Sequence, residues 1–124
     1  MTAVTPHLPG QEALAALASR YVTLDAIPWQ PTRFPGIEQK ILMEDKERGL
    51  YTALMRWAPG STLPMHEHVE IEQTFVLEGS LKDDEGEAKA GEFVWRPAGS
   101  THSVVSPEGA LILAFFIQPN RFYD

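Results

Sequence analysis

Three histidines and one glutamate lie in the sequence at a spacing that suits a bound metal ion. His66 and His68 are two residues apart, Glu72 follows closely, and His102 comes later in the chain. Side chains two apart in an extended strand point to the same face, so His66 and His68 offer two ligands at a fixed separation. Imidazole and carboxylate suit divalent Fe, Mn, Ni, Cu and Zn. Such a set leaves about two of six octahedral positions for water, dioxygen or substrate.

Other interpretations of these residues are weaker. A single histidine in a strand is usually just a hydrogen-bonded polar residue, but four suitable ligands make a metal site the better prediction. The chain has no cysteine, which excludes thiolate ligands and disulfides. His66-Glu67 begins like a zincin helix, but Glu70 stands where the second histidine belongs. We expect Glu70 at the solvent-facing rim, and His7 on the surface.

Glycines bound two segments that contain all four candidate ligands. Residues 60–79 read G-x5-H-x-H-x3-E-x6-G, and residues 91–106 read G-x5-P-x-G-x2-H-x3-S. These segments resemble the two sequence motifs of the cupin superfamily. The first motif matches at every fixed position, and the second departs only at its end, where Ser106 replaces an asparagine that is not a metal ligand in the family.

The resemblance implies an all-β fold, the double-stranded β-helix or jelly-roll barrel of cupins, which is usually dimeric. Further short stretches, such as 96–100 and 119–124, look like two groups of single-domain cupins. One group comprises small dioxygenases that cleave carbon–carbon bonds of diketones and hydroxyacetophenones. The other is the zinc-binding cupin domain of ChrR-type anti-sigma factors.

The pattern of strands and turns agrees with this fold class. The 124 residues suffice for one domain, 1–124, and short apolar runs separated by turn residues indicate an antiparallel sandwich or barrel. Residues 1–20 are expected to form an arm with one short helix over 11–20. In that helix Leu14, Leu17 and Tyr21 would share one packing face.

Several apolar side chains are assigned to the interior. We expect core packing or pocket lining for Met55, Trp57, Met65, Phe75, Phe93 and Trp95, with Trp57, Phe75 and Trp95 making the lumen small. Leu111 to Ile117 is apolar at nearly every position and should be buried on both faces. One lumen can bury only one face, which favours a homodimer. The acidic residues 82–87 are expected to form a solvated hairpin turn.

Charge and composition exclude some partners. The net charge of −7 makes nucleic acid and anionic membrane surfaces poor partners. No apolar run approaches the length of about 20 residues needed for a membrane helix, and no secretion signal is visible. Together with the absence of cysteine, this favours a cytoplasmic protein that acts on a small molecule.

The function that fits best is a non-haem metal-dependent dioxygenase for a small diketone or aryl ketone. Its divalent metal, Fe, Zn, Ni or Mn, would be held by His66, His68, Glu72 and His102, with Glu72 also tuning catalysis. The alternative is a non-catalytic zinc-binding sensor module like the ChrR cupin domain, although residues 11–20 are too short for a sigma-binding domain. A metal-free epimerase fits poorly because the ligand set is complete.

Overall fold

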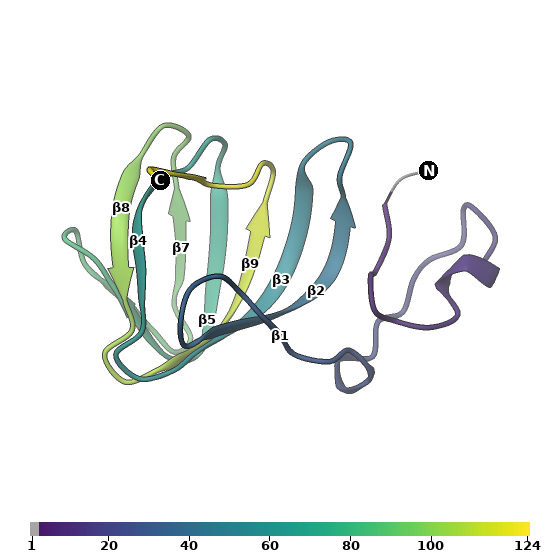
Figure 1. The fold of residues 1–124 in the computed structure, drawn as a ribbon, viewed down its shortest axis with the longest axis horizontal. Helices are drawn as coiled ribbons and strands as arrows, with labels where there is room; N and C mark the ends of the chain where they lie inside the picture. The colour runs from purple at the N-terminus through teal and green to yellow at the C-terminus, as the bar shows by residue number, and fades with distance from the viewer. Residues whose placement is uncertain (1–2) are drawn as a thin grey trace.

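The computed structural model describes residues 3–124, and within them ten strands form one curled antiparallel sheet (Figure 1). The strands are β1 (Gln30–Pro31), β2 (Ile37–Asp45), β3 (Leu50–Trp57), β4 (Thr62–Glu67), β5 (Glu72–Lys82), β6 (Glu87–Lys89), β7 (Phe93–Arg96), β8 (Thr101–Val105), β9 (Ala110–Phe116) and β10 (Arg121–Phe122). This confirms the predicted all-β jelly-roll class.

The long strand β5 belongs to both halves of the barrel. Its first part pairs with β7 and β9, its last three residues pair with β6, and Lys82 also pairs with Val105 of β8. The change occurs after Gly79, beyond a register shift between Val76 and Glu78. Because β5 takes part in both halves, a residue early in β5 and a residue on β8 can face the same interior.

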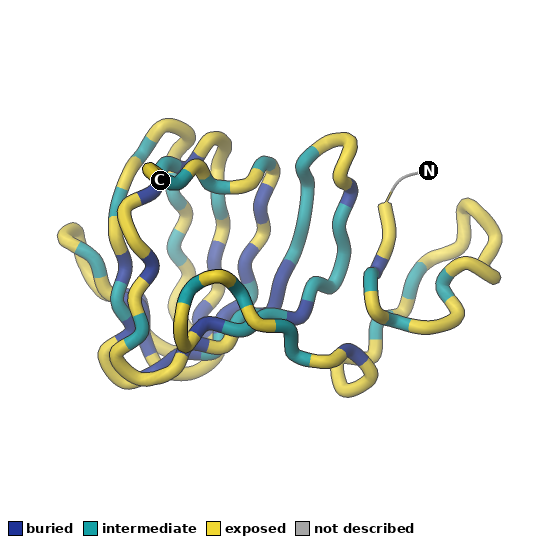
Figure 2. The backbone as a smooth tube through the Cα atoms, in the orientation of Figure 1, coloured by how far each residue is buried: buried dark blue, intermediate teal, exposed yellow. Residues whose placement is uncertain are grey.

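The barrel interior is filled from alternate positions of these strands. The buried cluster comprises Ile37, Trp57, Leu63, Val76, Leu81, Ala88, Val104, Ala110, Ile112, Ala114 and Phe116. Successive side chains of a strand point to opposite faces, so a regular strand contributes every second residue, whereas the register shift in β5 separates Val76 from Leu81 by five positions. Figure 2 shows buried segments along the barrel strands, whereas the N-terminal segment is mostly exposed.

The motif glycine Gly79 is required by close packing of two backbones. It has φ 72°, and a Cβ atom there would lie 1.8 Å from the carbonyl oxygen of Gly109. Any side chain would therefore push β5 away from the turn before β9. Ser106, where the motif departs from the family, is fully buried, and its hydroxyl donates to the carbonyl of Ser80 at 2.7 Å.

The predicted N-terminal helix is reduced to one 3-10 turn, η1 (Gln11–Ala13), and a second turn, η2 (Leu24–Ala26), follows. The predicted packing face is wrong, because Leu14, Leu17 and Tyr21 are 41%, 94% and 88% exposed. Because these side chains are exposed, a short helix here would gain little from tertiary packing. Within residues 3–124 no helix has the length and apolar character that a membrane crossing needs.

The strand alternation also corrects four interior assignments. Trp57 is buried and Met55 packs against the core, as predicted. Met65, Phe75, Phe93 and Trp95 are instead 46%, 38%, 52% and 56% exposed, although Phe93 and Trp95 do line an open pocket that also includes His68 and His102. The reason is parity: Thr74 and Val76 point inward on β5, so Phe75 between them must point outward.

Likewise Leu111 to Ile117 is buried on one face only. Ile112, Ala114 and Phe116 are buried, whereas Phe115 and Ile117 are 39% and 45% exposed. The outward residues of β9 lie beside those of β5 and β7, since Phe75 is the register partner of both Phe93 and Leu113. We define the outer apolar face as Phe75, Leu77, Phe93, Trp95, Leu113 and Phe115.

We expect Gly79→Ala to lower the free energy of unfolding by more than about 2 kcal/mol, because strain at positive φ is added to a backbone clash. Gly60→Ala is the matched control, since Gly60 has φ 80° but a Cβ atom there would meet no other atom within 4 Å. Gly60→Ala should lower the free energy of unfolding by only about 1 kcal/mol. Chemical denaturation measures both; equal losses would contradict this explanation of Gly79.

We propose that a second copy of the chain covers the outer apolar face. Contiguous aromatic side chains on a monomer surface are uncommon, and an obligate dimer would bury upward of about 2,000 Å². Light scattering should give the mass of a dimer at micromolar concentration, and Phe93→Lys should shift it toward monomer. Leu17→Lys, on an exposed residue away from this face, should not. A monomer mass for the unmodified protein would refute the proposal.

Candidate metal centre

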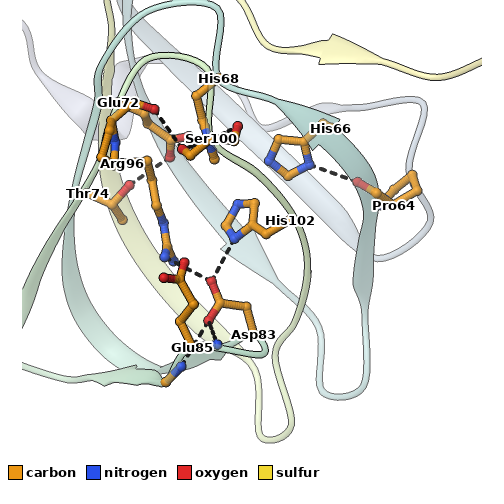
Figure 3. A network of polar contacts seen from close by, with 12 residues as sticks. Pro64, His66, His68, Glu72, Thr74, Asp83, Glu85, Arg96, Ser100 and His102 are labelled. Carbon is orange, nitrogen blue, oxygen red and sulfur yellow. Dashed lines mark hydrogen bonds and ion pairs between the residues drawn. The ribbon is translucent and has the colours of Figure 1, made fainter.

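The three motif histidines come from two antiparallel strands and from the loop that follows the first of them. His66 lies on β4 and is the register partner of His102 on β8. His68 follows the end of β4, where its backbone N–H donates to the carbonyl of Ser100 at 2.9 Å. Glu72 is the first residue of β5. The sequence-predicted residues therefore converge on one end of the barrel (Figure 3).

The three imidazoles form a compact, buried cluster. One ring nitrogen from each of His66, His68 and His102 lies within 4.8 Å of the others. The ring centroids are 4.6 to 5.0 Å apart. His66 and His68 are each only 1% exposed. This cluster could bind a metal ion, since neutral imidazole is a common ligand for divalent transition metals.

Each of these three histidines makes a hydrogen bond to another residue of the chain through its Nδ1 atom. Nδ1 of His66 lies 2.8 Å from the carbonyl oxygen of Pro64, and Nδ1 of His102 lies 2.7 Å from Oδ2 of Asp83. Nδ1 of His68 lies 3.1 Å from the carbonyl oxygen of Ser100 and 2.9 Å from its hydroxyl. Carbonyl and carboxylate oxygens only accept, so Nδ1 carries the proton and Nε2 keeps a free lone pair.

Glu72 lies against this cluster but outside the three-histidine group. Its Oε1 is 3.2 Å from Nε2 of His68, and the hydroxyl of Thr74 donates to its Oε2 at 2.8 Å. With Nδ1 of His68 donating to Ser100, Nε2 and Oε1 are two acceptors facing each other, and Nε2 is buried without a hydrogen-bond partner. A cation beside both atoms would satisfy them, so the residues fit a divalent metal.

The surroundings of His66, His102 and Glu72 favour the protonation states that metals require. Burial lowers the pKa of His66 to about 4 and also lowers the pKa of His102, so both are neutral at pH 7. Burial alone would raise the pKa of Glu72, but that pKa lies below its ordinary value; the hydrogen bond that Thr74 donates to Oε2 lowers it, and a cation beside Oε1 would lower it further. Glu72 is therefore an anion.

Asp83 corrects the prediction that residues 82–87 form only a solvated turn. Its side chain is 2% exposed and accepts from His102 and from Arg96, whose Nη1 lies 2.9 Å away. Burial would raise the pKa of Asp83, but hydrogen bonds and the charge of Arg96 lower it. Counting alternation from Glu72 would have placed Asp83 outside; it points inward like Leu81 because of the register shift between Val76 and Glu78. By contrast Glu70 and His7 are exposed, as predicted.

A cavity of about 270 Å³ opens beside the cluster inside the barrel. His66, Glu72 and His102 lie in its wall, and much of the remaining lining is apolar, including Trp57, Ile112 and Phe116. Tyr51 also lines it, and burial, assisted by the charge of Glu72, raises the pKa of this phenol. The Tyr51 hydroxyl group therefore stays protonated and can donate a hydrogen bond.

Comparisons with known proteins agree with the fold. A family model described as the ChrR cupin-like domain matches residues 17–120. A putative acetylacetone dioxygenase from Methylibium petroleiphilum superposes with a TM-score of 0.79 at 24% identity, over 90% of this chain and 85% of that chain. An acetylacetone dioxygenase from Acinetobacter johnsonii gives a TM-score of 0.77 at 22% identity, over 90% and 82%.

A third solved structure is the Rhodobacter sphaeroides complex of SigE with the anti-sigma ChrR. It gives a TM-score of 0.63 at 25% identity, over 76% of this chain and 50% of that chain. No curated protein matches the sequence. At these identities the solved structures support the shared cupin fold, and the metal centre rests on the geometry described above.

Replacing His68 or His102 by alanine should each reduce metal content strongly, because each change removes one ligand bond. His7→Ala is the control, since His7 is exposed and lies far from the cluster in sequence. Elemental analysis of protein purified without added metal measures the content. Full content in both His68→Ala and His102→Ala would show that the metal lies elsewhere.

Acid should destabilise the metal-free protein through His66. Its pKa is about 4 when folded and about 6.5 when unfolded, so between these values only the unfolded chain gains the proton. Stability should therefore fall as the pH drops from 6.5 toward 4, by at most about 3 kcal/mol from this residue. Denaturant unfolding at several pH values measures this, and the free energy of unfolding of His66→Gln should decrease less over the same pH range. A His66 titration midpoint near 6.5 by NMR would contradict the burial effect.

Proposed function

We propose that this chain, which belongs to the ChrR cupin-like domain family, is a metal-dependent dioxygenase of a small β-diketone or hydroxylated aryl ketone. The observation that supports this most is the cluster of three imidazoles with free Nε2 atoms beside a small, largely apolar cavity. Two structural neighbours are described as acetylacetone dioxygenases, one of them putatively.

The protein residues would perform three tasks around the metal. His66, His68, Glu72 and His102 would hold it. A divalent redox-active ion would supply Lewis acidity toward two substrate oxygens and electron transfer toward dioxygen. The apolar wall, including Trp57 and Phe116, would keep water from the reacting atoms. Both oxygen atoms would enter the cleaved products, so no external reductant is needed.

Glu72 and Tyr51 would adjust the charge of the site. Glu72 adds one negative charge, and Thr74 fixes the direction of its carboxylate through the bond to Oε2. Tyr51 stacks on Phe116, with ring centroids 4.3 Å apart, which holds its ring in the cavity wall. A protonated Tyr51 hydroxyl group would donate to a carbonyl or enolate oxygen of the substrate.

A second candidate function is a zinc-binding sensor or binding module. The family match itself favours it, because the family is described by the ChrR cupin-like domain. The two functions differ in metal. Iron in protein purified without added metal would favour the oxygenase, whereas tightly held stoichiometric zinc would favour the module.

We expect the iron-loaded protein to consume dioxygen with a small β-diketone or hydroxylated aryl ketone, and bulky substrates to be excluded by the 270 Å³ cavity. Glu72→Gln should slow turnover by at least about tenfold and weaken metal binding less, because it removes charge and keeps shape. Glu70→Gln, an exposed carboxylate two positions earlier, is the matched control. An oxygen electrode with iron, manganese, nickel and zinc forms gives the comparison.

Absence of oxygen uptake in every redox-active form, together with tight zinc binding, would replace the dioxygenase by the sensor module. Equal rates for Glu72→Gln and the unmodified protein would remove Glu72 from the reaction. The Glu70→Gln variant separates these outcomes from a general effect of lost negative charge.

A further inference from the structure

Asp83 makes a long-range connection between the β5–β6 hairpin and the histidine cluster. It follows β5 directly, and its Oδ2 accepts the Nδ1 proton of His102 at 2.7 Å. His102 lies on β8, 19 residues further along the chain. In Figure 3 the Asp83 carboxylate lies between His102 and the Arg96 guanidinium group. The contact therefore joins two strands that the metal site requires to be fixed relative to each other.

The Asp83 carboxylate is itself held from several directions. Arg96 donates to the same Oδ2 atom at 2.9 Å. The backbone N–H groups of Glu85 and Gly86 donate to Oδ1 at 2.9 and 3.0 Å. With both oxygens occupied and the side chain 2% exposed, the carboxylate has little freedom to turn. It is thus a rigid acceptor for His102.

Asp83 differs in charge from the acceptors of the other two histidines. His66 donates to the carbonyl of Pro64, and His68 donates to the carbonyl and hydroxyl oxygens of Ser100, all of them neutral. A carboxylate acceptor makes the imidazole a stronger electron donor at its other nitrogen than a neutral acceptor does. Of the three histidines, His102 is therefore the one whose Nε2 is most strengthened by its partner.

We propose that Asp83 is a positioning residue that holds His102 in the Nδ1-protonated tautomer and directs its Nε2 lone pair at the metal. This inference rests on the proposed metal site and extends it to the β5–β6 hairpin, which the cupin motifs do not include. Arg96 supports the same arrangement by fixing the carboxylate. A competing explanation is that Asp83 serves only to shape the hairpin through its bonds to Glu85 and Gly86.

The affinity test compares Asp83 with its neighbour. Asp84 is exposed in the same hairpin, so Asp84→Asn and Asp84→Ala remove the same charge without touching His102. Zinc affinity is measured by competition with a chromophoric chelator. We expect Asp83→Ala to bind zinc about 10- to 100-fold more weakly, with Asp83→Asn, which keeps an acceptor oxygen, losing less. Both Asp84 variants should match the unmodified protein.

A second readout separates positioning from mere hairpin structure. Nitrogen-15 NMR of the metal-free protein reports which ring nitrogen of each histidine carries the proton. His102 should be protonated at Nδ1 in the unmodified protein and in both Asp84 variants, and should show a mixture of tautomers in Asp83→Ala. His66 and His68, which use other acceptors, should keep their Nδ1 protons. If Asp83→Ala does not fold, the zinc affinity of Asp83→Asn, compared with that of Asp84→Asn, tests the positioning role.

Each outcome has a definite meaning. Asp83 variants that bind zinc as tightly as the Asp84 variants would overturn the positioning role while leaving the metal site intact. An unchanged His102 tautomer in folded Asp83→Ala, or equal tautomer changes at all three histidines, would do the same. Failure of the unmodified protein to bind zinc, iron, nickel or manganese would instead overturn the proposed metal site itself.

Discussion

The proposed site depends on one interaction, the hydrogen bond from the Nδ1 atom of each motif histidine to a fixed acceptor. Pro64, Ser100 and Asp83 supply these acceptors from three different parts of the chain. Without them the imidazole rings could rotate or exchange tautomers, and the Nε2 lone pairs would not point toward one common position. With them, the Nε2 atoms of the three imidazoles face one small volume beside the Glu72 carboxylate, and a cation is the chemical partner that suits this group.

The barrel serves mainly to place these acceptors and donors within one small volume. The antiparallel pairing of β4 with β8 sets His66 opposite His102, and β5 passes from one half of the sheet to the other so that Glu72 and Asp83 flank the cluster at its two ends. Gly79 allows this passage by letting the β5 backbone approach Gly109. Strand β5, with Gly79, therefore determines both the path of the barrel sheet and the positions of Glu72 and Asp83 beside the histidine cluster.

Much of this was predictable from the spacing of a few residues. The glycine-bounded segments indicated the fold and grouped His66, His68 and His102, because a motif specifies local geometry in each strand. Alternation would also have placed Phe75 outside, had parity been counted from Glu72. It would not have placed Asp83 inside, because the register shift between Val76 and Glu78 changes which residues of β5 point inward. The acceptors Pro64 and Ser100 could not be predicted, since backbone carbonyl groups have no sequence signature. The helix over 11–20 failed because propensity without a packing surface stabilises little.

X-ray absorption spectroscopy on the protein loaded with one equivalent of iron or zinc tests the central claim most directly. The proposed site predicts stoichiometric binding with three imidazole ligands, recognised by their outer-ring scattering, and additional oxygen ligands that include one from Glu72. A spectrum showing oxygen ligands alone, or one imidazole fewer in His7→Ala than in the unmodified protein, would contradict it. So would a protein that leaves the metal in solution at neutral pH.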